Sequence, residues 1–400
     1  MNNAFLHGNL HEEVYMKLPQ GLAVSSLELV CKLNKFLYGL KQASRQWYAK
    51  LTEALYSRGY IHSMYDYPLF YKRTSDRVVF VGVYVDDVLL TGNDLTEIQM
   101  LKTFLYDQFK IKDLVKLYYF LGLEVLYRKG GILISQRKFT LDRLKEYDYL
   151  HATSLSSPLD PITKLKAKEG VPLSDPTFYT QLVGKLNFLT NTRLDIAYGV
   201  YHLNKYMQDL REPHLQAAYH MLRYLLKDPT LGLFMSSDND FSVKAYCDSD
   251  WAACPNSRKL VSGYLILLAN SPISWKSKKK ETISLSSVEV EYRSIRKVVG
   301  ELVWLHRMLT ELTVPPVLPI PVFCGSQYIL HIARNPVFHE RTKHIEVDCY
   351  FVRTKLTEGL ILLQHIRTGD QLADILTKSL TGIKHSTVLG KLALCSPPPT

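Results

Sequence analysis

Residues 78–90 read VVFVGVYVDDVLL, and this stretch determines how the first part of the chain folds. One apolar run ends at Val85 and another begins at Val88, so the spacing predicts two antiparallel strands joined by a tight turn. That turn carries Asp86 and Asp87 side by side. Neighbouring carboxylates repel each other unless a cation neutralises them, as in a magnesium site. Paired aspartates also occur in ordinary turns, so the spacing alone leaves both interpretations open.

The composition predicts a folded protein of two or three domains. The chain has 400 residues, of which 46% are hydrophobic and 11% aromatic. The 49 Lys and Arg residues exceed the 38 Asp and Glu residues and give a net charge of +11. This excess favours a polyanionic partner such as nucleic acid, with a solvated basic surface as the alternative. Every apolar run is much shorter than the roughly 20 residues of a bilayer span, so we expect no membrane-spanning segment.

The cysteines and the first residues indicate a compartment with reduced thiols. The six cysteines show no paired spacing, so we expect neither a disulfide framework nor a zinc knuckle. Residues 1–10 lack the basic flank and apolar block of a secretory signal. We therefore expect a cytoplasmic or nuclear protein that is not secreted.

Hydrophobic periodicity divides the chain into regions. Residues 1–136 mix strands and helices, and the apolar stripe through Trp47, Leu51 and Leu55 predicts a helix whose stripe belongs to the core. Three successive helical stripes in residues 137–235 predict a small bundle. The following residues predict three strands, a long helix and then alternating strands and helices, which together indicate an α/β domain. The strands are expected at 243–247, 263–268 and 273–277, the domain at 236–385, and a tail at 386–400.

Four segments of the first region resemble the reverse transcriptase of copia-type LTR retrotransposons. They are residues 3–8 (NAFLHG), 12–19 (EEVYMKLP), 37–43 (LYGLKQA) and 84–87 (YVDD), in this order. The resemblance implies a palm in which three aspartates hold two magnesium ions for joining a DNA primer to a nucleotide on an RNA template. Asp86 and Asp87 match two of these aspartates.

The resemblance also assigns nucleic-acid contacts in the palm. Phe5 matches the bulky residue that screens the sugar 2′ position, and Lys41 with Gln42 matches the segment that supports the template and nucleotide pocket. The family places its third palm aspartate five residues before Phe5, which falls ahead of Met1. We therefore expect a truncated palm without fingers that does not polymerise, because the loss of one metal ligand disturbs the in-line geometry.

The second region resembles the thumb and connection of the same enzymes. Residues 119–125 and 135–140 match the passage from palm to thumb, and residues 176–226 match the helical part. The resemblance implies that several basic side chains face the duplex backbone, although a solvated helix surface explains them equally well. These side chains are Lys185, Arg193, Lys205 and Arg223.

The third region resembles the ribonuclease H of these elements, in which four carboxylates hold two magnesium ions that activate water against an RNA phosphodiester. Asp248, in the segment YCDSDWA at 246–252, matches the first carboxylate, and Asp250 is a possible decoy on the same strand face. Asp374, in DQLADILTK at 370–378, matches the fourth, with Asp370 as the expected N-cap.

The second ribonuclease carboxylate can be chosen by helix geometry. Glu289 and Glu291 point about 200° apart on a helix. Glu289 is three residues after Ser286 and is explained as the partner of a capping box. We therefore predict that Glu291 is the metal ligand.

The third ribonuclease position departs from the family. A Cys-Asp step is expected at the end of a strand, whereas residues 323–327 read FCGSQ. Gly325 cannot bind a metal ion, so we expect weak occupancy by Mg²⁺ or Mn²⁺ and a severe loss of cleavage.

Two further segments suit contact with an RNA–DNA hybrid. Residues 335–346 (NPVFHERTKHIE) match a family segment in which His344 is interpreted as loop structure or a hybrid contact rather than a metal ligand. Trp275, Lys276 and Lys278 combine an aromatic ring with basic side chains, which suits a duplex backbone, and a solvated lysine-rich hairpin explains them as well.

Together these matches predict a multidomain α/β and α+β protein: a truncated palm (1–136), a helical thumb or connection (137–235) and a mixed-sheet ribonuclease H-like domain (236–385). By ancestry it is an RNA-directed DNA polymerase and a ribonuclease of RNA–DNA hybrids with impaired chemistry. The alternative is a nucleic-acid-binding remnant without enzymatic activity.

Overall fold

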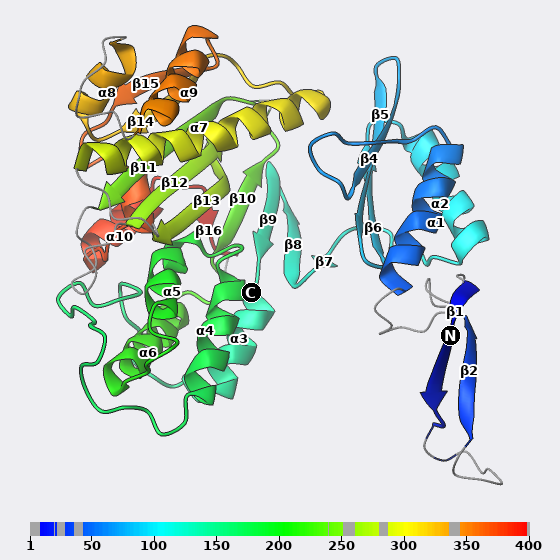
Figure 1. Ribbon diagram of the computed structural model, residues 1–400, viewed down its shortest axis with the longest axis horizontal. Helices are drawn as coiled ribbons and strands as arrows, with labels where there is room; N and C mark the ends of the chain where they lie inside the picture. Colours follow the sequence, from blue (N-terminus) through cyan, green and yellow to red (C-terminus); the bar gives the residue numbers. More distant parts are fainter. Residues whose placement is uncertain are drawn as a thin grey trace. The chain divides into compact units, whose positions relative to one another are not determined.

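The computed structural model describes residues 9–19, 21, 29–35, 43–238, 240–250, 261–279, 287–335 and 345–397. The chain forms two compact units, Met1–Lys116 and Leu117–Thr400 (Figure 1). Each is described by itself below. No helix among these residues has both the length and the apolar character that crossing a membrane requires.

The first unit packs two helices against an antiparallel sheet of order β3-β4-β5-β6. Trp47, Leu51 and Leu55 of α1 are buried against this sheet, as their spacing predicts. A separate hairpin is formed by β1 and β2. The elements are β1 (Asn9–Lys17), β2 (Val30–Lys35), α1 (Ala43–Ser57), β3 (Ile61–His62), β4 (Leu69–Thr74), β5 (Arg77–Tyr84), β6 (Asp87–Gly92) and α2 (Leu95–Phe109).

The second unit begins with a sheet and a helical bundle. The sheet has the order β16-β10-β9-β8-β7, so it joins strands from before and after the bundle. The predicted helices are present, and their apolar stripes form one core. These elements are β7 (Tyr119–Phe120), β8 (Leu123–Arg128), β9 (Gly131–Ser135), α3 (Arg137–Glu146), α4 (Thr177–Leu189), η2 (Leu194–Ile196), α5 (Ala197–Asn204), α6 (Glu212–Lys227), β10 (Gly232–Ser236) and β16 (Leu394–Cys395).

The predicted α/β fold follows β10. Its sheet has the order β13-β12-β11-β14-β15, with antiparallel pairs up to β11 and parallel pairs beyond it. The elements are β11 (Val243–Asp250), β12 (Val261–Leu268), β13 (Ser271–Lys279), α7 (Ser287–Glu311), β14 (Ile320–Cys324), α8 (Gln327–Arg334), α9 (Glu346–Thr357), β15 (Ile361–His365), η4 (Leu372–Leu376) and α10 (Gly382–Leu389).

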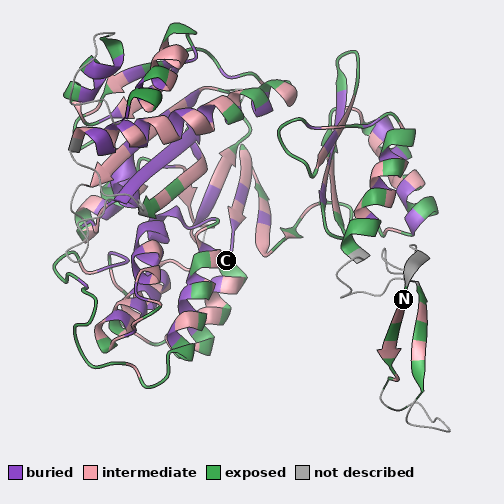
Figure 2. Ribbon diagram, viewed as in Figure 1, coloured by how far each residue is buried: buried purple, intermediate pink, exposed green. Residues whose placement is uncertain are grey.

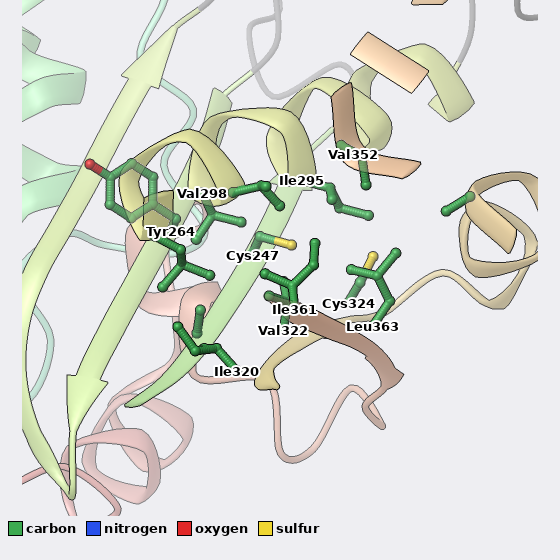
Figure 3. Close-up of a cluster of buried hydrophobic side chains, with 14 of the residues drawn as sticks. Cys247, Tyr264, Ile295, Val298, Ile320, Val322, Cys324, Val352, Ile361 and Leu363 are labelled. Atoms are coloured by element: carbon green, nitrogen blue, oxygen red, sulfur yellow. The ribbon is translucent and has the colours of Figure 1, made fainter. Parts of the chain in front are cut away.

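Both faces of this mixed sheet are covered. Helix α7 lies along one face (Figure 1), and its Ile295 and Val298 pack with Cys247 and Cys324 of the strands (Figure 3). On the other face, η4 contacts β11, β12 and β13. Strand β12 is almost wholly buried as a result (Figure 2). A mixed sheet enclosed in this way holds the ends of its central strands in fixed positions.

Candidate functional site

The two central parallel strands bring the first candidate residues together. Cys247 of β11 pairs in register with Cys324 of β14, and both thiols are buried. Asp248 and Gly325 are the residues that follow this pair in the sequence, so they lie beside each other toward the carboxyl ends of the two strands. Carboxyl ends of adjacent parallel strands are the usual place for a ligand in open α/β sheets.

A cavity of about 230 Å³ opens at the carboxyl ends of these two strands. It combines three acidic side chains with one lysine and several small polar groups. The lining residues are Cys247, Asp248, Ser249, Glu291, Ser294, Cys324, Gly325, Ser326, Thr368, Gln371, Asp374 and Lys378. The structure therefore gathers Asp248, Glu291, Gly325 and Asp374, which the sequence analysis selected, around one space.

Helix α7 presents Glu291 to the cavity, whereas Glu289 is not among the lining residues. Glu289 is buried and pairs with Arg293, with 2.7 Å between oxygen and nitrogen. The expected capping partner, Ser286, lies outside the described residues. Oε2 of Glu291 is buried and has no hydrogen-bond partner. Burial raises the pKa of Glu291, Asp248 raises it further, and a hydrogen bond from Ser326 opposes the shift.

Asp374 comes from η4 and is almost fully buried. The predicted N-cap of this segment is wrong: Gln371 caps it by accepting from the Ala373 N–H at 3.2 Å, and exposed Asp370 pairs with Lys391. Gln371 takes the capping position in place of Asp370 because its amide also donates to the Cys247 carbonyl at 3.1 Å. This hydrogen bond fixes η4 against β11.

Lys378 joins two of the three carboxylates. Its Nζ lies 3.1 Å from Oδ2 of Asp248 and 2.9 Å from Oδ1 of Asp374. Lys384 contacts the other Asp374 oxygen at 2.7 Å, and the Thr377 hydroxyl donates to Oδ2 of Asp248 at 2.5 Å. Burial lowers the pKa of Lys378, but the charges of Asp248 and Asp374 outweigh burial and raise it. The ammonium group is therefore a fixed positive charge between them.

Gly325 leaves room for a side chain at the position where the resemblance leads us to expect a carboxylate. A Cβ atom built on this residue has no neighbour within 4 Å. Because Gly325 lies beside Asp248 and lines the cavity, an aspartate here would add a fourth carboxylate to the cavity. The space that an aspartate side chain would occupy at this position is therefore open.

The cavity offers some, but not all, of its acidic oxygens to a divalent ion. Carboxylates are the ligands that Mg²⁺ prefers, and the unpartnered oxygen of Glu291 is an available donor. Asp248 and Asp374, however, already share the Lys378 ammonium. Within the described ranges, no group of three or more His, Cys, Asp or Glu side chains is arranged to hold a metal ion.

The first unit places Asp86 and Asp87 at the tip of the β5–β6 hairpin, as predicted, and both are exposed. The turn is held by Trp47, whose indole N–H donates to the Val85 carbonyl at 2.7 Å. Val85 has a φ of +54°, which is unfavourable for a β-branched residue. Sequence reasoning assigned Trp47 to the core alone and missed this second role.

Several predicted contact residues cannot be placed. Phe5, Lys41, Gln42 and His344 lie outside the described residues. Lys276 and Lys278 lie on the edge strand β13 and are exposed. Burial lowers the pKa of the neighbouring Lys297, and the charges of Lys278 and Lys276 lower it further. Lys297 belongs to α7 and donates to the Ser262 hydroxyl at 3.2 Å. We call Lys276, Lys278 and Lys297 together the lysine edge.

The interpretation of Arg193 as a backbone contact is wrong. Arg193 is 2% exposed, and its guanidinium contacts Asp195 at 2.8 Å. The Tyr224 hydroxyl donates to the same carboxylate at 2.6 Å. A charge enclosed in this way stabilises the bundle and cannot reach a duplex. The other three cations have protein partners as well: Lys185 contacts Glu146, Nζ of Lys205 lies 3.1 Å from Nδ1 of His202, and Arg223 donates to the Thr153 carbonyl.

Comparisons with known proteins agree with this arrangement of segments. The family described as reverse transcriptase (RNA-dependent DNA polymerase) matches residues 1–161. The retrovirus-related Pol polyprotein from transposon RE1 of Arabidopsis thaliana is 39% identical over 401 residues, which cover 100% of this chain and 27% of that polyprotein. A putative transposon Ty5-1 protein of Saccharomyces cerevisiae is 31% identical, covering 76% of this chain and 99% of that protein.

Among solved structures, the N-terminal RNase H domain of a Mycobacterium tuberculosis protein shares 12% identity with a TM-score of 0.26, covering 38% of this chain and 97% of that chain. The chain spans only 27% of the length of the RE1 polyprotein.

Proposed function

Because the chain belongs to the reverse transcriptase family of retrotransposon Pol polyproteins, we propose that its second unit holds a ribonuclease H site whose cleavage of RNA–DNA hybrids is impaired. The observation that carries this proposal is the cavity in which Asp248, Glu291 and Asp374 lie beside Gly325. Enzymes of this kind generally use divalent metal ions. We propose that Mg²⁺ or Mn²⁺ binds weakly here, because one carboxylate position is a glycine.

Hybrid binding is supported by the lysine edge. Lys276, Lys278 and Lys297 repel one another, and a nearby phosphate backbone would relieve that repulsion. The net charge of +11 favours the same class of partner. For the first unit, Asp86 and Asp87 support descent from a polymerase that uses an RNA template and a DNA primer. We propose a cytoplasmic or nuclear location, since the described cysteines are free thiols.

The cleavage test compares the natural chain with Gly325→Asp on a labelled RNA–DNA hybrid in Mg²⁺ and in Mn²⁺. We expect cleavage to rise by more than the roughly 10- to 100-fold that supporting residues of a metal site contribute. The control is Gly184→Asp, which adds the same charge at an exposed position of α4 with open space around it. Equal cleavage by the natural chain and Gly325→Asp would show that another group completes the site.

The binding test measures hybrid affinity by fluorescence anisotropy at several salt concentrations. The double variant Lys276→Gln, Lys278→Gln should bind more weakly, and the slope of log affinity against log salt should fall by about 2. The control is Lys164→Gln, Lys168→Gln, which removes two exposed charges elsewhere. Retained binding with no cleavage by either the natural chain or Gly325→Asp would favour the alternative, a nucleic-acid-binding remnant.

A further inference from the structure

Both oxygens of the Asp374 carboxylate contact lysine ammonium groups of the same chain. Lys378 contacts Oδ1 at 2.9 Å and Lys384 contacts Oδ2 at 2.7 Å. Lys378 also contacts Oδ2 of Asp248 at 3.1 Å, so its ammonium is shared by two acidic groups on different elements. Lys384 has no such second carboxylate among its salt bridges in the described part of the chain.

Local backbone geometry fixes Lys378 in this position. The backbone N–H of Lys378 donates to the Asp374 carbonyl at 3.0 Å, so the end of η4 holds the two residues one helical turn apart. The adjacent Thr377 is buried and donates its hydroxyl to Asp248 at 2.5 Å. Gly263 of β12 allows this approach, because a Cβ there would lie 2.8 Å from Leu376 and 2.9 Å from Thr377. The lysine therefore sits on a packed segment rather than at the end of a loose loop.

Lys378 supplies the positive charge that the two neighbouring carboxylates of the cavity require. Two carboxylates that face one small space destabilise each other unless a cation lies between them. A divalent ion between two carboxylates would fill that place, but here the lysine ammonium fills it. Since the side chain of Asp374 is only 1% exposed, it has little water to replace this partner.

We propose that the Lys378 ammonium takes the place of one of the two divalent ions, so that the cavity of this chain binds a single metal ion. The inference rests on the proposed function in treating the cavity as the ribonuclease site. The remaining ion would be held at Glu291, which lines the same cavity and has an unpartnered oxygen. Mg²⁺ is commonly held by one or two carboxylates together with waters, so such a site needs no further protein ligand.

The test counts bound ions rather than reaction products. Mn²⁺ is titrated into the full chain, and the free ion is followed by its electron paramagnetic resonance signal. We expect Lys378→Met to bind one ion more per chain than the natural protein does. Comparing the two chains cancels any ions held elsewhere, for example near exposed Asp86 and Asp87. Adding Asp374→Asn to Lys378→Met should abolish the additional ion.

Two matched variants separate the bridge from general effects of charge. Lys378→Arg keeps the positive charge and should bind as many ions as the natural chain. Lys384→Met removes the other lysine on Asp374 while leaving the bridge, and it should also show no additional ion. Lys378→Gln, which can still donate hydrogen bonds, replaces Lys378→Met if circular dichroism shows that the methionine variant does not fold.

The result that overturns the proposal is an equal ion count for the natural chain and the neutral Lys378 variants at saturating Mn²⁺. That result would mean that the lysine moves aside when metal binds. The count is independent of hybrid cleavage, so it can fail while the proposed ribonuclease function stands. Conversely, a Gly325→Asp variant that does not cleave the hybrid would contradict the proposed ribonuclease function. It would not affect the comparison of ion counts between the natural chain and the Lys378 variants.

Discussion

Two clusters of the second unit, each joining a basic side chain to carboxylate oxygens, differ in their access to solvent. In the sealed cluster, Arg193 and Asp195 have side chains only 2% and 0% exposed, and Tyr224 covers them. In the cavity cluster, Lys378 is 33% exposed and lines the same space as Asp248 and Asp374. An enclosed ion pair can only support the fold, whereas one that borders a cavity can exchange its partner for a ligand.

Removing one acid from each cluster tests this difference most strongly. We expect Asp195→Ala to lower the free energy of unfolding by about 3–5 kcal/mol, because it leaves the Arg193 charge buried and unpaired. Asp374→Asn should cost about 1–2 kcal/mol, because Lys378 keeps Asp248 as a partner and Lys384 can turn toward water. Urea denaturation of the two variants measures both values. Equal losses would mean that the clusters do not differ as we describe.

A methyl group at Gly263 of β12 should disturb the cavity cluster through the segment that carries Leu376 and Thr377. The Cβ of Gly263→Ala would lie 2.8 Å from Cβ of Leu376, so η4 must shift and Thr377 must withdraw from Asp248. Overpacking of this kind typically costs about 1–3 kcal/mol. The control is Gly82→Ala, whose nearest atom would be at an ordinary 3.8 Å. Thermal unfolding compares the two, and an unchanged melting temperature for Gly263→Ala would contradict the close contact.

The smallest expected effect concerns pH and the sealed cluster. Burial lowers the pKa of His385 below its usual 6.5, although the charge of Asp195 opposes the shift. A lowered histidine pKa in the folded state means that stability is fully present above 6.5 and is lost as pH falls toward the folded value. His385→Gln should remove a slope of at most about 1.4 kcal/mol per pH unit. Urea midpoints between pH 7 and 5 measure the slope, and identical slopes for both proteins would exclude a role for His385.

Local patterns were sufficient to predict much of the fold. The apolar runs around Asp86 gave the hairpin, and the stripe through Trp47 gave a buried helix face. Helical spacing chose Glu291 over Glu289, and only Glu291 lines the cavity. The hairpin and the helix face could be predicted because each depends on residues within one element or one turn, whereas the metal-binding role of Glu291 stays a prediction.

Contacts between distant segments could not be predicted in the same way. The burial of Arg193 depends on Tyr224, which comes from another helix, so a surface role was inferred wrongly. The sheet that joins β9 to β10 and β16 has no local signature. Lys378 was overlooked although its spacing of four residues from Asp374 was a usable signal, because only the fold brings Asp248 to the same ammonium.

The pairing of β9 with β10 has a consequence for motion within the second unit. Leu233 pairs with Ile134, so the whole bundle from α3 to α6 is inserted between two neighbouring antiparallel strands. A module on a single linker can swing freely, but this one is tethered at two adjacent points. The Trp275 indole of β13 also donates to the Thr190 carbonyl at 3.1 Å, and Val261 of β12 joins the core of the bundle, so further contacts hold the bundle against the mixed sheet.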